Sequence, residues 1–163
     1  MSTRRPKPPV PGRAEAAVLR AVLDVLRYYG IEPARHNVGA AVNASGRLVM
    51  FGRKGDADIR TMIPAGWGSA SGKALHIETK RGGFDPARLR GARREHFERQ
   101  LARLREVNAG GGYGFWVRDA AEVIGALERI RQGWRVVIEG DWPILTYEPV
   151  VPDRGPEAGG PAG

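Results

Sequence analysis

Apolar residues recur at helical spacing in three segments of the chain. Residues 13–29 carry an apolar stripe that ends before a glycine, and residues 120–131 form another helical segment. Between them, Asp85 and Pro86 resemble a helix start, with aspartate as N-cap and proline at the first helical position. This helix is expected to run to about Asn108, before a run of glycines. The pattern therefore predicts three helices.

Short apolar runs bounded by turn residues predict strands. The runs expected to form strands are residues 47–51, 58–63, 74–80 and 113–117. Residues 134–138 and 143–147 are expected to form a hairpin around Gly140 and Asp141. Residues 35–40 are expected to be irregular or briefly extended, with a turn after them.

The order of these elements predicts an α/β fold with the arrangement α-β-β-β-α-β-α and a C-terminal hairpin. Turns and loops link the first three strands, whereas a helix connects the third strand to the fourth, so the sheet is expected to be mixed. One domain is expected over residues 13–148. Residues 1–12 are expected to be a disordered basic arm, and residues 149–163 a disordered tail rich in proline and glycine.

Composition is typical of a soluble globular domain, with 42% hydrophobic and 27% charged residues among 163. No apolar run approaches the roughly 20 residues of a membrane span, and the amino terminus lacks the apolar core of a secretory signal. The absence of cysteine excludes disulfides and thiolate zinc sites, and it favours a cytoplasmic location. A net charge of +8 favours a polyanionic partner such as nucleic acid.

An acid and an amine stand two positions apart in the third predicted strand. Glu78 and Lys80 share one face of that strand, and Asp58 opens the preceding strand after a glycine turn. Two carboxylates brought together by neighbouring strands repel each other, and a hard divalent cation relieves the repulsion. Asp58, Glu78 and the main-chain carbonyl of Thr79 are therefore expected to hold Mg²⁺ or Mn²⁺. Lys80 is expected to orient the attacking water or to stabilise charge on the phosphoryl group.

Lysine at this position stands out, because the chain contains four lysines against twenty-two arginines. The pKa of a lysine can be shifted, whereas a guanidinium stays charged, so Lys80 suits a chemical role. A Glu78–Lys80 ion pair at a sheet edge would nevertheless give the same pattern. Asp56 competes with Asp58 for the metal position. His76 is expected to be a hydrogen-bonded residue of the sheet and not part of the site.

In their order and spacing, these motifs resemble the virus-type replication-repair nuclease (VRR-NUC) domain of the PD-(D/E)xK superfamily. The resemblance runs from about Glu15 to Leu127. It rests on Glu15 in the first helix, the segment 35–40, the Gly-x-x-Asp motif at 55–58, the acid-x-Lys triplet at 78–80, and Gln100 ahead of Gly111.

This resemblance implies a restriction-endonuclease-like core and metal-dependent hydrolysis of DNA phosphodiester bonds. The catalytic residues it implies are Glu15, Asp58, Glu78, Lys80 and Gln100. Arg94 and His96 compete with Gln100 for its place, and the helix dipole alone would favour Glu15 in a first helical turn.

Seven arginines occur between Arg88 and Arg105 with few acids among them, so this segment is expected to contact phosphates. The residues expected to bind nucleic acid are Lys54, Arg81, Arg88, Arg93 and Arg94. The expected function is that of a bacterial or phage DNA endonuclease in replication or repair, either nonspecific or selective for branched DNA such as a Holliday junction. A homodimer would suit branched DNA. A non-catalytic nucleic-acid-binding module with the same fold is the alternative.

Overall fold

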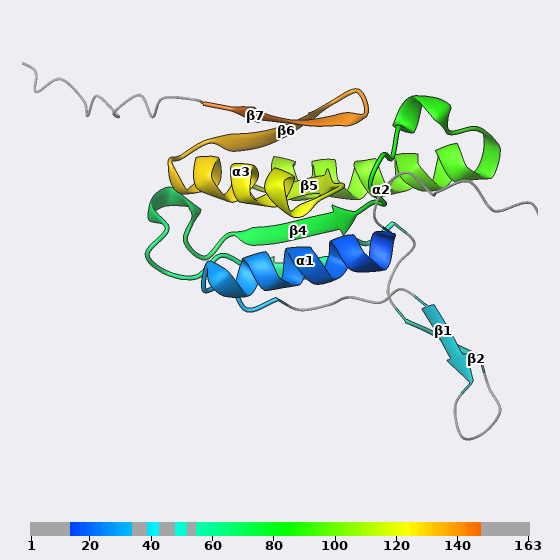
Figure 1. The fold of residues 1–163 in the computed structure, drawn as a ribbon, viewed down its shortest axis with the longest axis horizontal. Coiled ribbons are helices and arrows are strands. Elements are labelled where there is room, and N and C mark those ends of the chain that lie inside the picture. The colour runs from blue at the N-terminus through cyan, green and yellow to red at the C-terminus, as the bar shows by residue number, and fades with distance from the viewer. Residues whose placement is uncertain (1–13, 34–38, 43–47, 52–54, 148–163) are drawn as a thin grey trace, which may run out of the picture.

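The computed structural model describes residues 14–33, 39–42, 48–51 and 55–147 (Figure 1). Its helices are α1 (Glu15–Tyr28), α2 (Gly91–Ala109) and α3 (Ala120–Arg131), with short 3₁₀ turns η1 (Gly68–Ala70) and η2 (Pro86–Arg88). Its strands are β1 (Gly39–Val42), β2 (Leu48–Phe51), β3 (Ile59–Met62), β4 (Ala74–Thr79), β5 (Tyr113–Val117), β6 (Arg135–Glu139) and β7 (Trp142–Thr146). None of the helices in these ranges has the length and apolar character needed to cross a membrane. The predicted arm and the predicted tail lie outside the described residues.

A three-stranded sheet in the order β3-β4-β5 holds the centre of the fold. β3 is antiparallel to β4 and pairs Ile59 with Ile77. β4 is parallel to β5 and pairs Glu78 with Trp116. The structure thus confirms the α/β class and the mixed sheet that the turn and crossover connections predicted.

β2 does not join this sheet, so the prediction of three consecutive strands in one sheet is wrong. β2 instead pairs with β1 in a separate two-stranded antiparallel sheet, with Gly39 opposite Phe51. The segment expected to be irregular therefore contributes a strand. Pairing across a short connection has the smaller entropic cost of loop closure, and apolar periodicity does not say which neighbour a strand will choose.

Helices cover both faces of the central sheet. In Figure 1, α1 and α3 lie on the viewer's side and α2 lies behind. The first apolar cluster joins α1 and α3 to the sheet through side chains such as Ile59, Ile77 and Phe115. The second joins α2 to the opposite face through Phe97 and Trp116. Because side chains alternate along a strand, the face that bears Trp116 also bears its neighbour across the ladder, Glu78.

α2 approaches β5 so closely that only glycine fits at position 114. A Cβ atom at Gly114 would lie 2.6 Å from the carbonyl oxygen of Leu104. Asn108 bonds to both main-chain groups of Gly114, accepting from its N–H at 2.6 Å and donating to its carbonyl at 2.9 Å. These contacts set the height of α2 over the sheet, and Gln100, about two helical turns before Asn108, then faces β4.

The helix predicted from Asp85 begins later than expected. The carboxylate of Asp85 does cap a helical turn, accepting from the N–H of Ala87 at 3.0 Å, but that turn is the 3₁₀ turn η2. The chain then extends through Leu89 and Arg90 before α2 starts at Gly91, where φ is +53°. An Asp-Pro signal marks the start of a helical turn without specifying how far the helix continues.

The predicted C-terminal hairpin is present as β6 and β7, which pair Glu139 with Trp142. It is tied to the core through its turn, because the indole N–H of Trp116 donates to the carbonyl oxygen of Asp141 at 2.8 Å. The guanidinium of Arg94 on α2 also binds the two carboxylate oxygens of Asp141 at 2.8 and 2.7 Å.

Candidate active site

The end of β4 holds an unusual group of buried polar side chains. Among the described residues, four polar or charged residues are buried, and all of them belong to this group: Glu78, Thr79, Lys80 and Gln100. Glu78 is 3% exposed and Lys80 8% exposed. Burial of a carboxylate and an ammonium is costly unless each has partners, so the contacts within the group decide what it can do.

Three of these side chains form a closed hydrogen-bond triangle. Lys80 Nζ donates to Glu78 Oε1 at 2.7 Å and to Gln100 Oε1 at 2.6 Å. Gln100 Nε2 donates to the same Glu78 oxygen. α2 therefore supplies Gln100 to the acid-x-Lys strand. Of the three candidates for this position, it is Gln100, and not Arg94 or His96, that contacts Glu78 and Lys80.

Asp58 lies beside this triangle, immediately before β3. The β3–β4 register pairs Ile59 with Ile77, so one further residue places Asp58 opposite Glu78. Oδ2 of Asp58 accepts two hydrogen bonds from Thr79, from the main-chain N–H at 2.8 Å and from the hydroxyl at 2.7 Å. Asp58, expected to be the first residue of a strand, thus lies one residue before β3, and it still comes next to Glu78 of the adjacent strand β4.

The main chain of Thr79 also faces Asp58. The N–H of the next residue, Lys80, donates to Val117 on β5 at 2.8 Å. Successive residues of a strand direct their main-chain groups to opposite sides, so those of Thr79 point away from β5 and toward Asp58. The Thr79 carbonyl therefore lies on the same side of β4 as the Asp58 carboxylate.

Asp56, the competitor of Asp58, has a different environment. Its carboxylate forms ion pairs with Arg103 on α2 at 3.3 Å and with Arg60 on β3 at 3.4 Å. Asp56 and His76 line a separate small cavity beside α2, together with both arginines. The geometry thus favours Asp58 as the acid next to Glu78, and His76 lies outside the triangle.

The Glu78 carboxyl is perturbed and incompletely bonded. Burial raises its pKa to about 7; the charge of Lys80 opposes this shift and that of Asp58 adds to it. Within the described part of the chain, Oε2 of Glu78 is buried and has no hydrogen-bond partner. A buried, unpaired carboxylate oxygen costs free energy, and a bound cation is one way to recover it.

The donor set is suited to a hard cation but sparse. No group of three or more His, Asp or Glu side chains that could hold a metal ion occurs among the residues described. Asp58 and Glu78 supply two carboxylates, and Thr79 can add a carbonyl. Oxygen donors of this kind are the preferred ligands of Mg²⁺ and Mn²⁺. A bound Mg²⁺ usually keeps several waters as well, so a few protein ligands are enough.

Lys80 and Gln100 form the floor of a cavity of about 460 Å³ that opens to the surface. Glu15, at the exposed start of α1, lines the same cavity, and its charge contributes to the raised pKa of Glu78. His96 and Arg93 line it from α2. The structure therefore brings Glu15 to the mouth of the site and not into the buried triangle.

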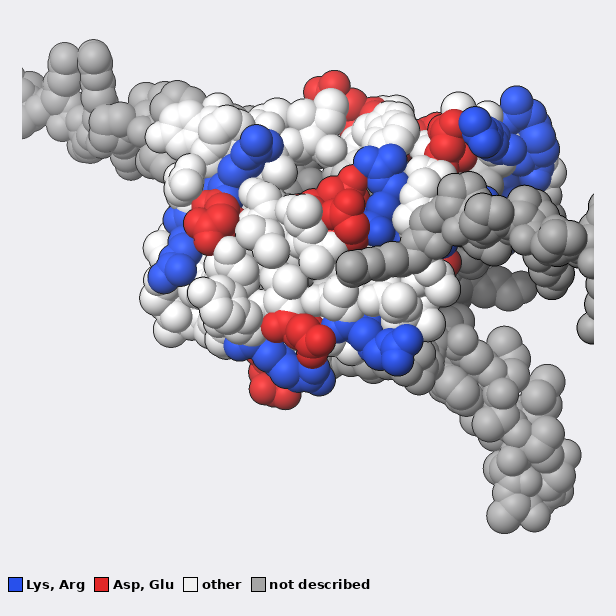
Figure 2. All heavy atoms as spheres, viewed as in Figure 1, with Lys and Arg blue, Asp and Glu red and all other residues white. Residues whose placement is uncertain are grey.

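An arginine-lined hollow of about 420 Å³ adjoins this cavity. The two share five lining residues: Arg81, Phe84, Leu89, Ala92 and Arg93. The hollow also includes Arg88 and Arg90. In Figure 2, Lys and Arg side chains gather at the end of the molecule where Figure 1 shows the chain leading into α2, and acidic side chains lie beside them there as elsewhere on this face. Within the hollow, Arg88 forms an ion pair with Asp85 at 3.3 Å.

Arg94, one of the residues expected to bind nucleic acid, does not line this surface. Arg94 is bound by Asp141 and by Glu98 at 2.8 Å, so its guanidinium links α2 to the C-terminal hairpin. Lys54 lies outside the described residues. Arg90, which the sequence did not single out, joins the surface because the extended step before α2 carries it there. Its place within the arginine-rich segment was the available signal.

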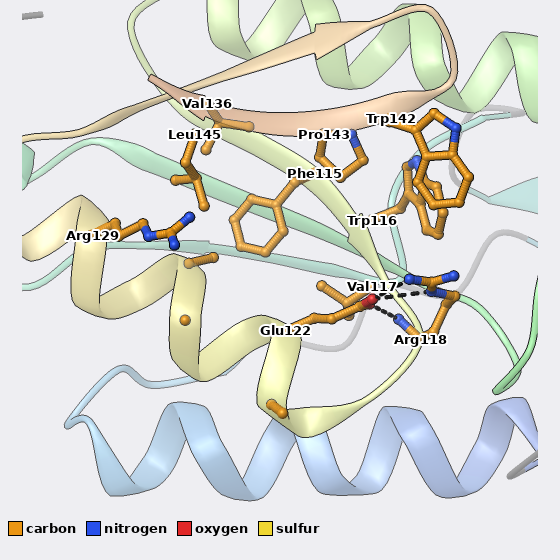
Figure 3. A pocket seen from close by; sticks show the side chains of 13 residues that line it. Phe115, Trp116, Val117, Arg118, Glu122, Arg129, Val136, Trp142, Pro143 and Leu145 are labelled. Atoms are coloured by element: carbon orange, nitrogen blue, oxygen red, sulfur yellow. Dashed lines mark hydrogen bonds and ion pairs between the residues drawn. The ribbon is translucent and has the colours of Figure 1, made fainter. Parts of the chain in front are cut away.

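A further cavity, of about 330 Å³, lies between β5, α3 and the β6–β7 hairpin (Figure 3). Its walls are largely apolar, with Phe115, Val136 and Leu145 pointing inward. Glu122 is the acid among its lining residues, and its carboxylate binds the guanidinium of Arg118 at 2.6 and 3.0 Å. Without a pair of carboxylates, this cavity has no metal-binding chemistry comparable to that at the end of β4.

Comparison with protein-family models, with curated proteins and with solved structures finds no match for this chain. The resemblance to the VRR-NUC domain consequently rests on the sequence motifs alone.

Proposed function

We propose that this chain is a Mg²⁺- or Mn²⁺-dependent nuclease that hydrolyses DNA phosphodiester bonds, with the site of a PD-(D/E)xK enzyme on a restriction-endonuclease-like core. The observation that carries the proposal is the buried Glu78–Lys80–Gln100 triangle next to Asp58. A buried ion pair is weak evidence for a stabilising role, because desolvation offsets the attraction. A buried carboxyl with a strongly raised pKa, whose partners Lys80 and Gln100 line a cavity, is more typical of a functional site.

In this proposal, Asp58, Glu78 and the Thr79 carbonyl hold the metal ion. A bound Mg²⁺ polarises a phosphoryl oxygen and lowers the pKa of a coordinated water. The unpaired Oε2 of Glu78 supports this assignment, because it supplies an oxygen that no side chain of the described residues uses. The negative charge of Asp58 next to Glu78 supports it as well.

Lys80 supplies the positive charge of the site. An ammonium has three N–H donors, and Glu78 and Gln100 accept from two of them. The third is available to the attacking water or to a phosphoryl oxygen, because Lys80 lines the open cavity. Gln100 holds the ammonium from the side of α2 while Lys80 is also bound to the Glu78 carboxylate.

The arginine-lined hollow gives the DNA strand a path away from the site. Arg81 and Arg93 belong to both cavities, and Arg88 and Arg90 extend the surface beyond them. All four side chains are exposed. Contacts between arginine and phosphate are independent of base sequence, so we propose binding that is sensitive to salt and has little base specificity.

The proposal also includes a preferred type of DNA. Branched DNA is the candidate that the resemblance suggests, and a homodimer would present two sites to two strands. DNA as substrate would place the protein in the cytoplasm of a bacterium, whether its gene belongs to the host or to a phage.

Cleavage assays test the proposal directly. Labelled four-way-junction, flap, duplex and single-stranded DNA are incubated with Mg²⁺, Mn²⁺ or EDTA. We expect metal-dependent cutting that falls at least about 100-fold in Glu78→Gln and in Lys80→Ala, because both changes remove charge from the reaction centre. Glu95→Gln on the exposed side of α2 and Lys73→Ala, next to the other end of β4, are matched controls that keep activity.

Binding without cutting by the wild-type protein in either metal would overturn the catalytic proposal. The chain would then be a nucleic-acid-binding module with the fold of a nuclease. Cutting that persists in both site variants would point to a contaminating nuclease, and it would remove the support for this site.

A further inference from the structure

We infer that the hydroxyl group of Thr79 is a positioning element of the proposed metal site, acting through Asp58. This inference rests on the proposed function. Thr79 is 1% exposed, and its hydroxyl donates to Oδ2 of Asp58 at 2.7 Å. The main-chain N–H of Thr79 donates to the same oxygen at 2.8 Å.

Two donors from one residue hold this carboxylate oxygen in a defined place. A single hydrogen bond would let the Asp58 carboxylate turn about it, whereas two donors from different directions restrict that rotation. The hydroxyl is buried, so water does not compete for it, and Asp58 is half-buried. The orientation of Asp58 thus depends on the side chain at the middle position of the acid-x-Lys triplet.

The position of Thr79 makes this bond specific to the site. Its side chain alternates with those of Glu78 and Lys80 along β4, so it is not part of their triangle. The Thr79 hydroxyl instead binds the carboxylate of Asp58, which lies just before β3. Thr79 therefore links Asp58 to β4, the strand that carries Glu78, and its hydroxyl determines how the two carboxylates are oriented toward each other.

Residues that orient metal ligands typically change metal affinity about 10- to 100-fold when they are removed. We therefore expect Thr79→Val, which deletes the hydroxyl and keeps the shape, to weaken Mn²⁺ binding by about that factor. Thr79→Ser keeps the hydroxyl and is expected to bind Mn²⁺ within a few-fold of wild type. The cleavage rate of Thr79→Val is expected to recover when Mn²⁺ is raised to saturation.

The experiment is a calorimetric titration of the full chain with Mn²⁺ alone, without DNA, paired with thermal unfolding in EDTA. Thr61→Val is the matched control. Its hydroxyl lies on the neighbouring strand β3 and donates to the carbonyl of Glu32 at 2.6 Å, away from the carboxylates. Thr61→Val is expected to change thermal stability without changing Mn²⁺ affinity. Thr79→Ala is a second variant that lacks the hydroxyl, should Thr79→Val not fold.

The outcomes separate this inference from the proposed function. Wild-type protein that binds Mn²⁺ and cuts DNA, with a folded Thr79→Val or Thr79→Ala variant of unchanged Mn²⁺ affinity, overturns the role of Thr79 alone. Failure of Thr79→Ser to restore binding also overturns it. Wild-type protein that neither binds Mn²⁺ nor cuts DNA removes the proposed function, and the positioning role with it.

Discussion

Lys80 and Gln100 are twenty residues apart in the chain, yet their side chains meet in a 2.6 Å hydrogen bond between β4 and α2. The same ammonium donates to Glu78 at 2.7 Å, so residues of both α2 and β4 bind the buried charge of Lys80. This contact connects the packing of α2 to the geometry of the carboxylate. Substitutions at Gln100 should therefore affect the chemistry of the site and also the stability of the fold, because the buried Lys80 and Glu78 each lose a partner.

Replacing Gln100 by leucine is expected to lower the turnover of DNA cleavage by about 10- to 100-fold at saturating Mg²⁺. Leucine fills the space but neither accepts from Lys80 nor donates to Glu78, so the amine is free to move. Gln132→Leu, at the exposed end of α3, is the control. Single-turnover kinetics measure the effect, and equal rates for the two variants would exclude a role for Gln100.

The stability of the metal-free protein should depend on pH through Glu78. The folded-state pKa of about 7 lies above the ordinary value of 4.5, so between these values the folded state holds a proton that the unfolded state has lost. Stability that is fully present below pH 4.5 is therefore lost as pH rises through 7, by on the order of 3 kcal/mol. Glu78→Gln removes this dependence.

Urea unfolding in EDTA at pH 5, 6, 7 and 8 measures this effect. The expected result is that Glu78→Gln becomes progressively more stable than wild type as pH rises, while it loses cleavage activity. A constant difference between the two proteins over this range would show that the pKa of Glu78 is not raised by folding.

The arginine-lined hollow should control the salt dependence of DNA binding. Each lost phosphate contact reduces the slope of log K against log salt concentration by about 0.9 for duplex DNA. The double variant Arg88→Gln with Arg90→Gln is expected to reduce the magnitude of this slope by up to about 1.8, the equivalent of two phosphate contacts. The matched pair Arg20→Gln and Arg27→Gln, on exposed positions of α1, should leave it unchanged. Fluorescence anisotropy in Ca²⁺ or EDTA gives the slopes, and equal losses in both pairs would contradict a localised interface.

Gly114 offers a direct test of the α2–β5 contact, and Gly125 on α3 serves as its control. Gly114→Ala places a Cβ atom 2.6 Å from the Leu104 carbonyl oxygen, so it is expected to destabilise the fold by about 1–3 kcal/mol or more. Gly125→Ala on α3 meets no atom within 4 Å and should stabilise by roughly 0.5–1 kcal/mol. Chemical denaturation measures both changes, and a neutral Gly114→Ala would mean that α2 lies farther from the sheet.

Local sequence patterns determined the helices, the C-terminal hairpin and the strand with the acid-x-Lys triplet. Apolar periodicity and turn-forming residues involve only a few neighbouring positions, so they can be read from the sequence without knowledge of the fold. The boundaries of α1 and α3 agree with the pattern to within two residues. The pattern overestimated α2, because the Asp85 cap belongs to a separate turn.

Tertiary structure decided which of several equivalent residues meet. Asp56 and Asp58 both precede β3, but only Asp58 falls opposite Glu78 in the strand register, while Asp56 pairs with Arg103. Arg94 and Gln100 occupy one helix, yet the height of α2 over β4 brings Gln100 to Lys80. Such choices depend on side chains from distant segments, and periodicity reports the face of an element without naming its partner.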